Sequence, residues 1–203
     1  MKIFEEKIAP NARRVRMFLA EKAIDNIEYV QLDLKKGDNI SREFKQMNPL
    51  AKIPVMELED GSYLSESVAI CRYFEADKPK PSLMGESPLQ QASIEMWQRR
   101  CELYFMNLIG MGFQHSSGYF ADRMTPVPEW GQECVKDAAK FLGLLNDHLA
   151  NSEYISGDTF SIADITAFVS IDFARVIKIR MSEDHTHLKR WYDQINARPS
   201  ARV

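Results

Sequence analysis

The chain has 203 residues, a net charge of −3, 45% apolar residues and 27% charged residues. This balance is typical of a globular protein with a sizeable buried core, and it provides no general attraction to nucleic acid or anionic membranes. The longest apolar runs are too short to cross a bilayer, and "MKIFEEKIAP" has acids where a signal peptide needs its apolar centre. We therefore expect a cytoplasmic protein.

The N-terminal part of the chain alternates between strand-like and helix-like patterns. Strands are predicted at "KIF", at "IEYVQLDL" and on both sides of Asp60-Gly61, a strong hairpin signal, in "IPVMELEDGSYL". Helices are predicted at "NARRVRMFLAEK" and "ESVAICRYFEA", and a short helix or turn at "SREFKQMN". The first two strands, separated by a helix, should pair in parallel, and the hairpin should add an antiparallel edge. These patterns predict an α/β domain.

A different pattern follows residues 79–87, whose prolines and glycine predict a linker. Only helical periodicity is found beyond it, and the segment 115–131 is too rich in proline and glycine to be continuous helix. The first apolar stripe consists of Ile94, Trp97, Cys101, Tyr104, Leu108 and Met111, and others follow at 135–149, 162–173 and 188–195. We predict an α/β domain at 1–78, a linker at 79–87 and an all-helical domain at 88–203.

Cys71, Cys101 and Cys134 are widely spaced and form no CxxC motif. Neither a zinc site nor a dithiol redox site is predicted from such spacing. All three lie in helical patterns, so we interpret them as small buried apolar residues, and no metal site is predicted.

Pro54 in "NPLAKIPVMELEDG" lies at the start of a predicted strand, where a residue without an N–H belongs. The dipeptide alone favours an ordinary trans bond. A cis Ile53–Pro54 bond would turn the chain sharply and leave backbone groups that an extended peptide ligand can pair with.

Glu66 and Ser67 in "YLSESVAI" lie at the beginning of a predicted helix, where free N–H groups and the helix dipole favour an anion. Ser67 and these N–H groups would hold a carboxylate, and Glu66 would hold an ammonium group. The alternative is ordinary helix capping with Ser65 as the N-cap. A third motif, "FSIADI", is a capping box of Ser161 and Asp164, and we assign it a folding role only.

Taken together and in this order, these motifs resemble the cytosolic glutathione S-transferase family. The resemblance is carried by "PNARRVRMFLAEK", "NPLAKIPVMELEDG", "LSESVAICRYF" and "ISGDTFSIADI", which span both predicted domains. It implies a thioredoxin-like N-terminal domain with a mixed four-stranded sheet, followed by an all-helical C-terminal domain. It also implies a homodimer with glutathione as co-substrate, a small electrophile as second substrate and no further cofactor.

The resemblance also implies roles for particular residues. Pro54 would be cis, the backbone of Ile53 would pair with the cysteine of glutathione, and Glu66 and Ser67 would hold its γ-glutamyl group. Lys52 would approach the glycyl carboxylate, with a weaker contribution from Asn39 or Lys36.

One departure from the family concerns the group that activates the thiol. Most members use a Tyr, Ser or Cys in the loop after the first strand, but here Ala9 occupies the serine position, as if in a bacterial or fungal type that lacks the usual residue. The remaining candidates are Asn11, the N–H groups of the first helix and His115, which would hold a water against the sulfur. The alternatives are that Asn11 is only an N-cap and that His115 is an exposed loop or cap residue in the break after a long helix.

Two further sets of residues have open interpretations. Arg13, Arg14 and Arg16 fan around the first helix, so solvation or a dimer-interface pair is favoured over phosphate binding. Six further residues are expected either to line an apolar wall for the second substrate or to belong to the core: Tyr104, Phe105, Met111, Phe113, Tyr119 and Phe120.

The expected function is transfer of glutathione to an electrophilic carbon. The alternatives are glutathione-dependent disulfide or peroxide reduction, and a non-catalytic role as an interaction module or ligand carrier. No nucleic-acid or membrane partner is expected.

Overall fold

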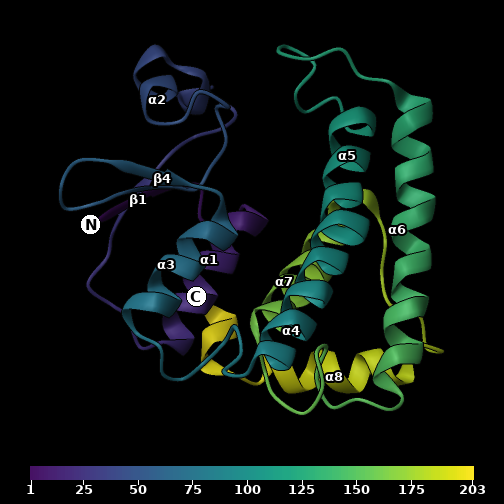
Figure 1. The fold of residues 1–203 in the computed structure, drawn as a ribbon. Coiled ribbons are helices and arrows are strands. Elements are labelled where there is room, and N and C mark those ends of the chain that lie inside the picture. Colours follow the sequence, from purple (N-terminus) through teal and green to yellow (C-terminus); the bar gives the residue numbers. More distant parts are fainter. The chain divides into compact units, whose positions relative to one another are not determined.

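The structure is a computed structural model that describes residues 1–203 and divides the chain into two compact units (Figure 1). Unit 1 comprises Met1–Ser82 together with Arg202–Val203, and unit 2 comprises Leu83–Ala201. The division after Ser82 falls inside the stretch predicted to be a linker.

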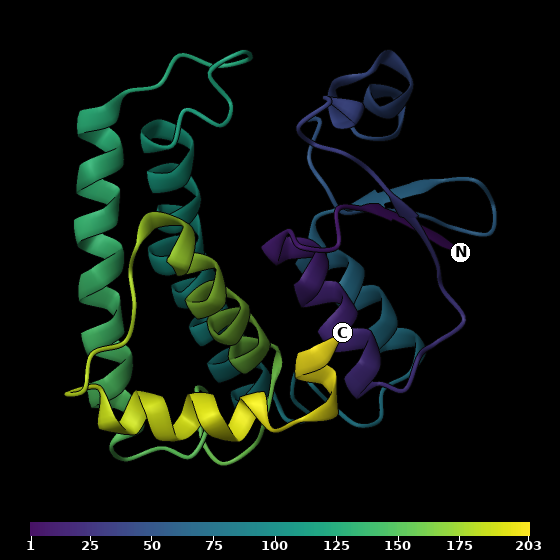
Figure 2. The ribbon, with the colours of Figure 1, turned by 180° about the vertical axis from the view of Figure 1, so that it is seen from behind.

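Unit 1 is an α/β unit built on one four-stranded sheet of order β2-β1-β3-β4. Its elements are β1 (Lys2–Glu5), α1 (Pro10–Glu21), β2 (Glu28–Gln31), the 3-10 helix η1 (Asp38–Ile40), α2 (Arg42–Met47), β3 (Val55–Glu57), β4 (Tyr63–Ser65) and α3 (Ser67–Asp77). Strand β1 pairs in parallel with β2 and antiparallel with β3, which pairs antiparallel with β4. The predicted mixed four-stranded sheet is confirmed. Helices α1 and α3 lie together on one side of the sheet and α2 on the other (Figures 1 and 2).

The β3–β4 connection is the hairpin turn predicted at Asp60-Gly61. Gly61 has a φ of 82°, a backbone conformation that glycine adopts without steric cost. The carboxylate of Asp60 accepts a hydrogen bond from the N–H of Ser62 at 2.9 Å, which closes the turn. The turn predicted from these residues is therefore confirmed.

A buried lysine ties the end of α1 to the segment that follows α3. The side chain of Lys22 is 0% exposed. Its Nζ donates to the carbonyl oxygens of Lys78 and Pro81, both at 2.7 Å, and forms an ion pair with Glu75. Because the cation is fully partnered, its burial is compatible with a stable fold.

Unit 2 is all-helical, as predicted. Its elements are α4 (Pro88–Cys101), the π-helix η2 (Glu102–Met106), α5 (Asn107–Ser116), α6 (Pro128–Leu149), α7 (Ile162–Phe173), the 3-10 helix η3 (Ala174–Ile177), α8 (Thr186–Asn196) and most of the 3-10 helix η4 (Pro199–Arg202), the last element of the chain. Helices α5 and α6 run side by side in both views (Figures 1 and 2). None of the helices combines the length and apolar character needed to span a lipid bilayer.

The π-helix changes which residues of the first long helical segment are buried. The predicted stripe continued from Cys101 to Tyr104, Leu108 and Met111, but Tyr104 is 59% exposed. In place of Tyr104, Leu108 and Met111, the buried residues are Phe105, Ile109 and Gly112, one position later in each case, and Met106 is buried as well. A π turn contains an extra residue, so the buried face moves by one position, which a strict 3.6-residue period does not anticipate.

The start of α7 confirms the predicted capping box of Ser161 and Asp164. The Asp164 carboxylate accepts hydrogen bonds from the N–H and hydroxyl of Ser161, from the N–H of Ile155 at 2.8 Å and from the indole N–H of Trp191 at 2.9 Å. Burial raises the pKa of Asp164 to about 6, although each of these hydrogen bonds acts to lower it. One carboxylate thus joins α7, α8 and the loop between α6 and α7.

Candidate functional site

The predicted glutathione-binding residues of unit 1 gather at one end of its sheet. The β3–β4 register pairs Val55 with Ser65, so Pro54 and Glu66 are the next residues at that end. The β1–β3 register pairs Phe4 with Val55, so the chain leaves β1 for α1 at the same end. The loop from β1 to α1, the segment that precedes β3 and the junction of β4 and α3 therefore meet at this end of the sheet.

Ile53 and Pro54 are joined by a cis peptide bond, as the resemblance implies, whereas the dipeptide alone favoured trans. The last paired position of β3 at this end is Val55, so the backbone of Ile53 lies beyond the strand ladder. Lys52 is exposed next to it. A ligand lying along Ile53 would therefore meet backbone groups that the sheet does not use.

Two asparagines hold the loop that precedes Ile53. The amide Nδ2 of Asn48 donates to the carbonyl of Lys52 at 2.8 Å, and that of Asn39 donates to the carbonyl of Ala51 at 2.7 Å. Asn39 thus supports the loop, while Lys36 forms an exposed ion pair with Asp33.

Glu66 is the N-cap residue of α3, so the interpretation of Ser65 as N-cap is wrong. Its φ of 68° and ψ of 112° form an unfavourable conformation for a residue with a Cβ, and its side chain makes no capping hydrogen bond. The carboxylate of Glu66 is exposed and is not used to stabilise its own helix. Non-glycine backbone of this kind concentrates at ligand-binding sites.

Ser67, the first residue of α3, is linked by its hydroxyl to α1. Its Oγ accepts a hydrogen bond from Nη1 of Arg14 at 2.8 Å and donates to Oδ1 of Asn11 at 3.4 Å. Asn11 is not an N-cap, because Ala9 occupies that position and Pro10 begins α1. The structure thus brings together two residues with different predicted roles, one for the γ-glutamyl group and one for the thiol.

Solvation, one of the two interpretations favoured for the arginines of α1, is wrong for Arg14 and Arg16, and the dimer-interface pair stays a prediction. Arg14 is 0% exposed. The Nε–H of Arg16 donates a hydrogen bond to Oε1 of the buried Glu5 at 2.7 Å, and Cζ of Arg16 lies 3.7 Å from the centre of the Tyr29 ring. Sequence reasoning missed Arg14, although its spacing of three residues from Asn11 and four from Phe18 indicates a shared helix face.

The three cysteines are buried, as predicted. Burial raises the pKa of the Cys71 thiol to about 12, although the nearby charge of Arg14 acts to lower it. A thiol in this state supplies almost no thiolate near neutral pH, so Cys71 is unsuited to nucleophilic chemistry.

His115 belongs to unit 2 and lies in the last turn of α5, not in the break after it as expected. Its Nδ1 accepts a hydrogen bond from the N–H of Val127, the N-cap residue of α6, at 2.9 Å. The neutral ring therefore carries its proton on Nε2. The side chain is half-buried and connects the two ends of the 117–127 segment.

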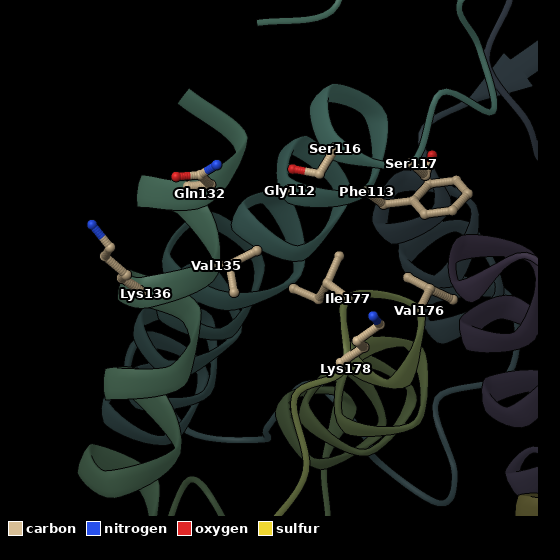
Figure 3. Close-up of a pocket in the computed structure, with 10 residues that line it drawn as sticks. All are labelled: Gly112, Phe113, Ser116, Ser117, Gln132, Val135, Lys136, Val176, Ile177 and Lys178. Atoms are coloured by element: carbon tan, nitrogen blue, oxygen red, sulfur yellow. The ribbon is translucent and has the colours of Figure 1, made fainter. Parts of the chain in front are cut away.

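Unit 2 also contains an open pocket of about 520 Å³ between α5, α6 and η3 (Figure 3). It is lined by Gly112, Phe113, Ser116, Ser117, Gln132, Val135, Lys136, Val176, Ile177 and Lys178. Val135, Val176 and Ile177 give it an apolar side, and Lys136 and Lys178 carry charges at its edge (Figure 3).

The aromatic residues proposed as a substrate wall have different positions. Phe113 lines this pocket and is in ring contact with Tyr119, Phe120 and Phe173. Phe105 is fully buried and stacks on Phe141, so it belongs to the core. Of the six residues, Phe105 is therefore excluded from an apolar wall.

Comparison with known families agrees with this architecture. The family model for the glutathione S-transferase N-terminal domain matches residues 8–77, and that for the C-terminal domain matches residues 126–199. Glutathione S-transferase 2 of Saccharomyces cerevisiae is 31% identical over 205 residues, which cover 100% of this chain and 88% of that protein. The chain therefore belongs to the glutathione S-transferase family.

Two solved structures and one further relative extend the comparison. The crystal structure of Gtt2 from Saccharomyces cerevisiae has a TM-score of 0.96 at 31% identity and covers 100% of this chain and 99% of that one. The class Gtt2 glutathione S-transferase of Vibrio parahaemolyticus has a TM-score of 0.87 at 36% identity, with coverage of 98% and 95%. Elongation factor 1-gamma 2 of Oryza sativa subsp. japonica is 33% identical over 183 residues. The match covers 85% of this chain but only 42% of that protein.

Proposed function

We propose that this protein is a glutathione transferase that conjugates the thiolate of glutathione to electrophilic carbon compounds. The thiolate sulfur forms a bond to the carbon, and the leaving group departs with its electron pair or the activated alkene takes up a proton. The observation that carries the proposal is the hydrogen bond between Ser67 and Asn11. It joins the position suited to the amino-acid head of glutathione to the position suited to its thiol.

In this proposal, the end of the sheet holds glutathione in an extended conformation. The free N–H groups at the start of α3, among them the backbone N–H of Ser67, bind the γ-glutamyl carboxylate, and Glu66 binds its ammonium group. The backbone of Ile53, next to Pro54, pairs with the cysteinyl residue, and Lys52 approaches the glycyl carboxylate. No cofactor besides glutathione takes part.

The main chemical task is to stabilise the thiolate. A free thiol has a pKa of about 8.5, so only a few per cent is ionised near neutral pH. Since Ala9 has no hydroxyl, we assign this task to the amide of Asn11 and to the N–H groups at the start of α1. His115, whose neutral ring carries its proton on Nε2, is the second candidate and would act through a water molecule.

We further propose a cytoplasmic homodimer, as in most members of the family. The dimer is tested by the mass of the purified protein in solution, which should be twice the 23.4 kDa of one chain.

The activity is tested by retention on immobilised glutathione and by turnover of a chloronitrobenzene with glutathione. Asn11→Ala and His115→Ala, assayed separately, identify the thiol-activating group, because loss of a major donor lowers the rate by about 10²-fold or more. If the protein is retained but turns over only a hydroxyethyl disulfide, the reductase alternative replaces the transferase.

A second candidate function is a non-catalytic interaction module. The observation that favours it is the similarity to elongation factor 1-gamma, in which the matched region is less than half of the protein. A protein that neither binds immobilised glutathione nor turns over either substrate would support this candidate instead.

A further inference from the structure

Arg14 is a buried charged residue that the proposed mechanism does not use. It lies on α1 with 0% of its surface exposed, and its Nη1 donates to Oγ of Ser67 at 2.8 Å. Arginine is seldom buried completely, because removing its charge from water is costly unless hydrogen bonds compensate. The position of Arg14 beneath the start of α3 therefore suggests a specific task.

The charge of Arg14 also acts on a second residue of α3. Burial raises the pKa of Cys71, and the charge of Arg14 acts to lower it. Ser67 and Cys71 are four residues apart and lie on one face of the helix. The guanidinium group therefore lies along the first turn of α3, on the side that faces α1.

The number of hydrogen-bond donors at Ser67 is limited. A serine hydroxyl has one proton and two acceptor lone pairs, whereas a guanidinium group can only donate. Because Arg14 donates to Ser67, the single proton of Ser67 must point to another acceptor, which here is Oδ1 of Asn11 at 3.4 Å. With Oδ1 engaged, the donor side of the Asn11 amide faces away from Ser67.

We propose that Arg14 is a positioning residue that makes the Ser67 hydroxyl a donor and, through it, orients Asn11 toward the glutathione thiol. This inference rests on the proposed function. Arg14 touches neither the sulfur nor the electrophile, and its effect on thiol activation passes through Ser67 and Asn11. The chain of contacts couples the head-binding end of the site to its reactive end.

The test uses the full-length protein and the variants Arg14→Met and Arg14→Lys, with Arg13→Met as a control of equal charge and size on the same helix. Folding is verified by circular dichroism. Binding is measured with S-methylglutathione, which has the head group but no thiol. Thiol activation is measured from the pH dependence of kcat/KM for the electrophile, with glutathione saturating, so that the profile reports the bound thiol.

A misplaced Asn11 should lower kcat about 10- to 100-fold. The rising limb of the pH profile in Arg14→Met should shift about one unit upward, since a tenfold loss of thiolate stabilisation raises the thiol pKa by one unit. Arg14→Lys, which restores a buried cationic donor, should recover part of this shift, and Arg13→Met should leave the profile unchanged. A folded Arg14→Met protein with the wild-type kcat and pH profile would overturn the inference.

Ser67→Ala keeps the test decisive if Arg14→Met does not fold. It removes the bridge but leaves Arg14 in place, and the inference expects the same upward shift of the pH profile. A loss of S-methylglutathione affinity with an unchanged pH profile would mean that nothing passes from Ser67 to Asn11, which contradicts the inference. If the wild-type protein itself binds no glutathione and has no activity, the proposed function fails instead.

Discussion

Nδ1 of His115 accepts a hydrogen bond from the backbone N–H of Val127, so one ring nitrogen has a structural role. The bond spans the segment between α5 and α6 and leaves Nε2 as the only nitrogen that can serve the proposed chemistry. A structural and a chemical role for His115 are therefore carried by different atoms of one ring and can be separated by substitution.

His115→Asn should preserve the structural role, because the amide oxygen of asparagine can accept from Val127 in place of Nδ1. His115→Ala removes the acceptor, and we expect it to lower the free energy of unfolding by about 1 kcal/mol. Urea unfolding of both variants measures this difference. If Nε2 holds a catalytic water, both variants should lose activity to a similar extent, and wild-type kcat in His115→Asn would restrict His115 to its structural role.

Glu66→Gly should raise stability and lower affinity for glutathione. Glycine adopts the φ of 68° without the strain that a Cβ imposes, so the free energy of unfolding should increase by about 1 kcal/mol. The proposed ammonium contact is lost at the same time. Glu66→Ala is the matched control, because it removes the carboxylate but keeps the Cβ.

Chemical denaturation and calorimetric titration with glutathione distinguish these two effects. Both variants should bind glutathione more weakly than the wild type, but only Glu66→Gly should be more stable. Wild-type affinity in Glu66→Ala would exclude the carboxylate from the binding site.

Asn11→Asp tests the donor role of the Asn11 amide. Aspartate retains an oxygen that accepts from Ser67, but it replaces the amide donor with a negative charge that opposes a nearby thiolate. We expect kcat to fall by about 10²-fold or more, while binding of S-methylglutathione changes little. Comparable losses of kcat and of binding would indicate that Asn11 serves the fold of the site and not the thiol.

Asp164→Ala should be strongly destabilising. It removes the acceptor of four hydrogen bonds and leaves buried N–H groups of Ile155 and Trp191 without partners. A loss of about 3 kcal/mol or more in the free energy of unfolding is expected. Asp164→Asn, which keeps one side-chain oxygen as an acceptor, should lose less, and denaturant titration at constant pH compares the two.

The same carboxyl group should make stability depend on pH. Because burial raises its pKa from 3.8 to about 6, the folded chain binds this proton more tightly than the unfolded chain. The resulting stabilisation is complete below pH ~4 and is lost as the pH rises through about 6. Subtracting the pH profile of Asp164→Asn from that of the wild type cancels the other titrating groups, and a flat difference would contradict the raised pKa.

Local patterns were sufficient to predict much of this fold. The alternation of strands and helices in unit 1, the turn at Asp60-Gly61 and the capping box of Ser161 and Asp164 depend on residues that are close in sequence. The stripe after Cys101 was predicted one position too early, because no short-range signal marks the π-helix that shifts it.

The sequence by itself determined the order of the elements, the turns and the family resemblance, because periodicity, caps and turn residues act over a few positions. Only the tertiary structure decided that Arg14 is buried against Ser67, that Ser67 reaches Asn11 and that His115 accepts from Val127. These partners lie on different helices or on opposite sides of a loop. The side chain that each polar group meets depends on how those elements pack, and their own spacing in the chain does not encode it.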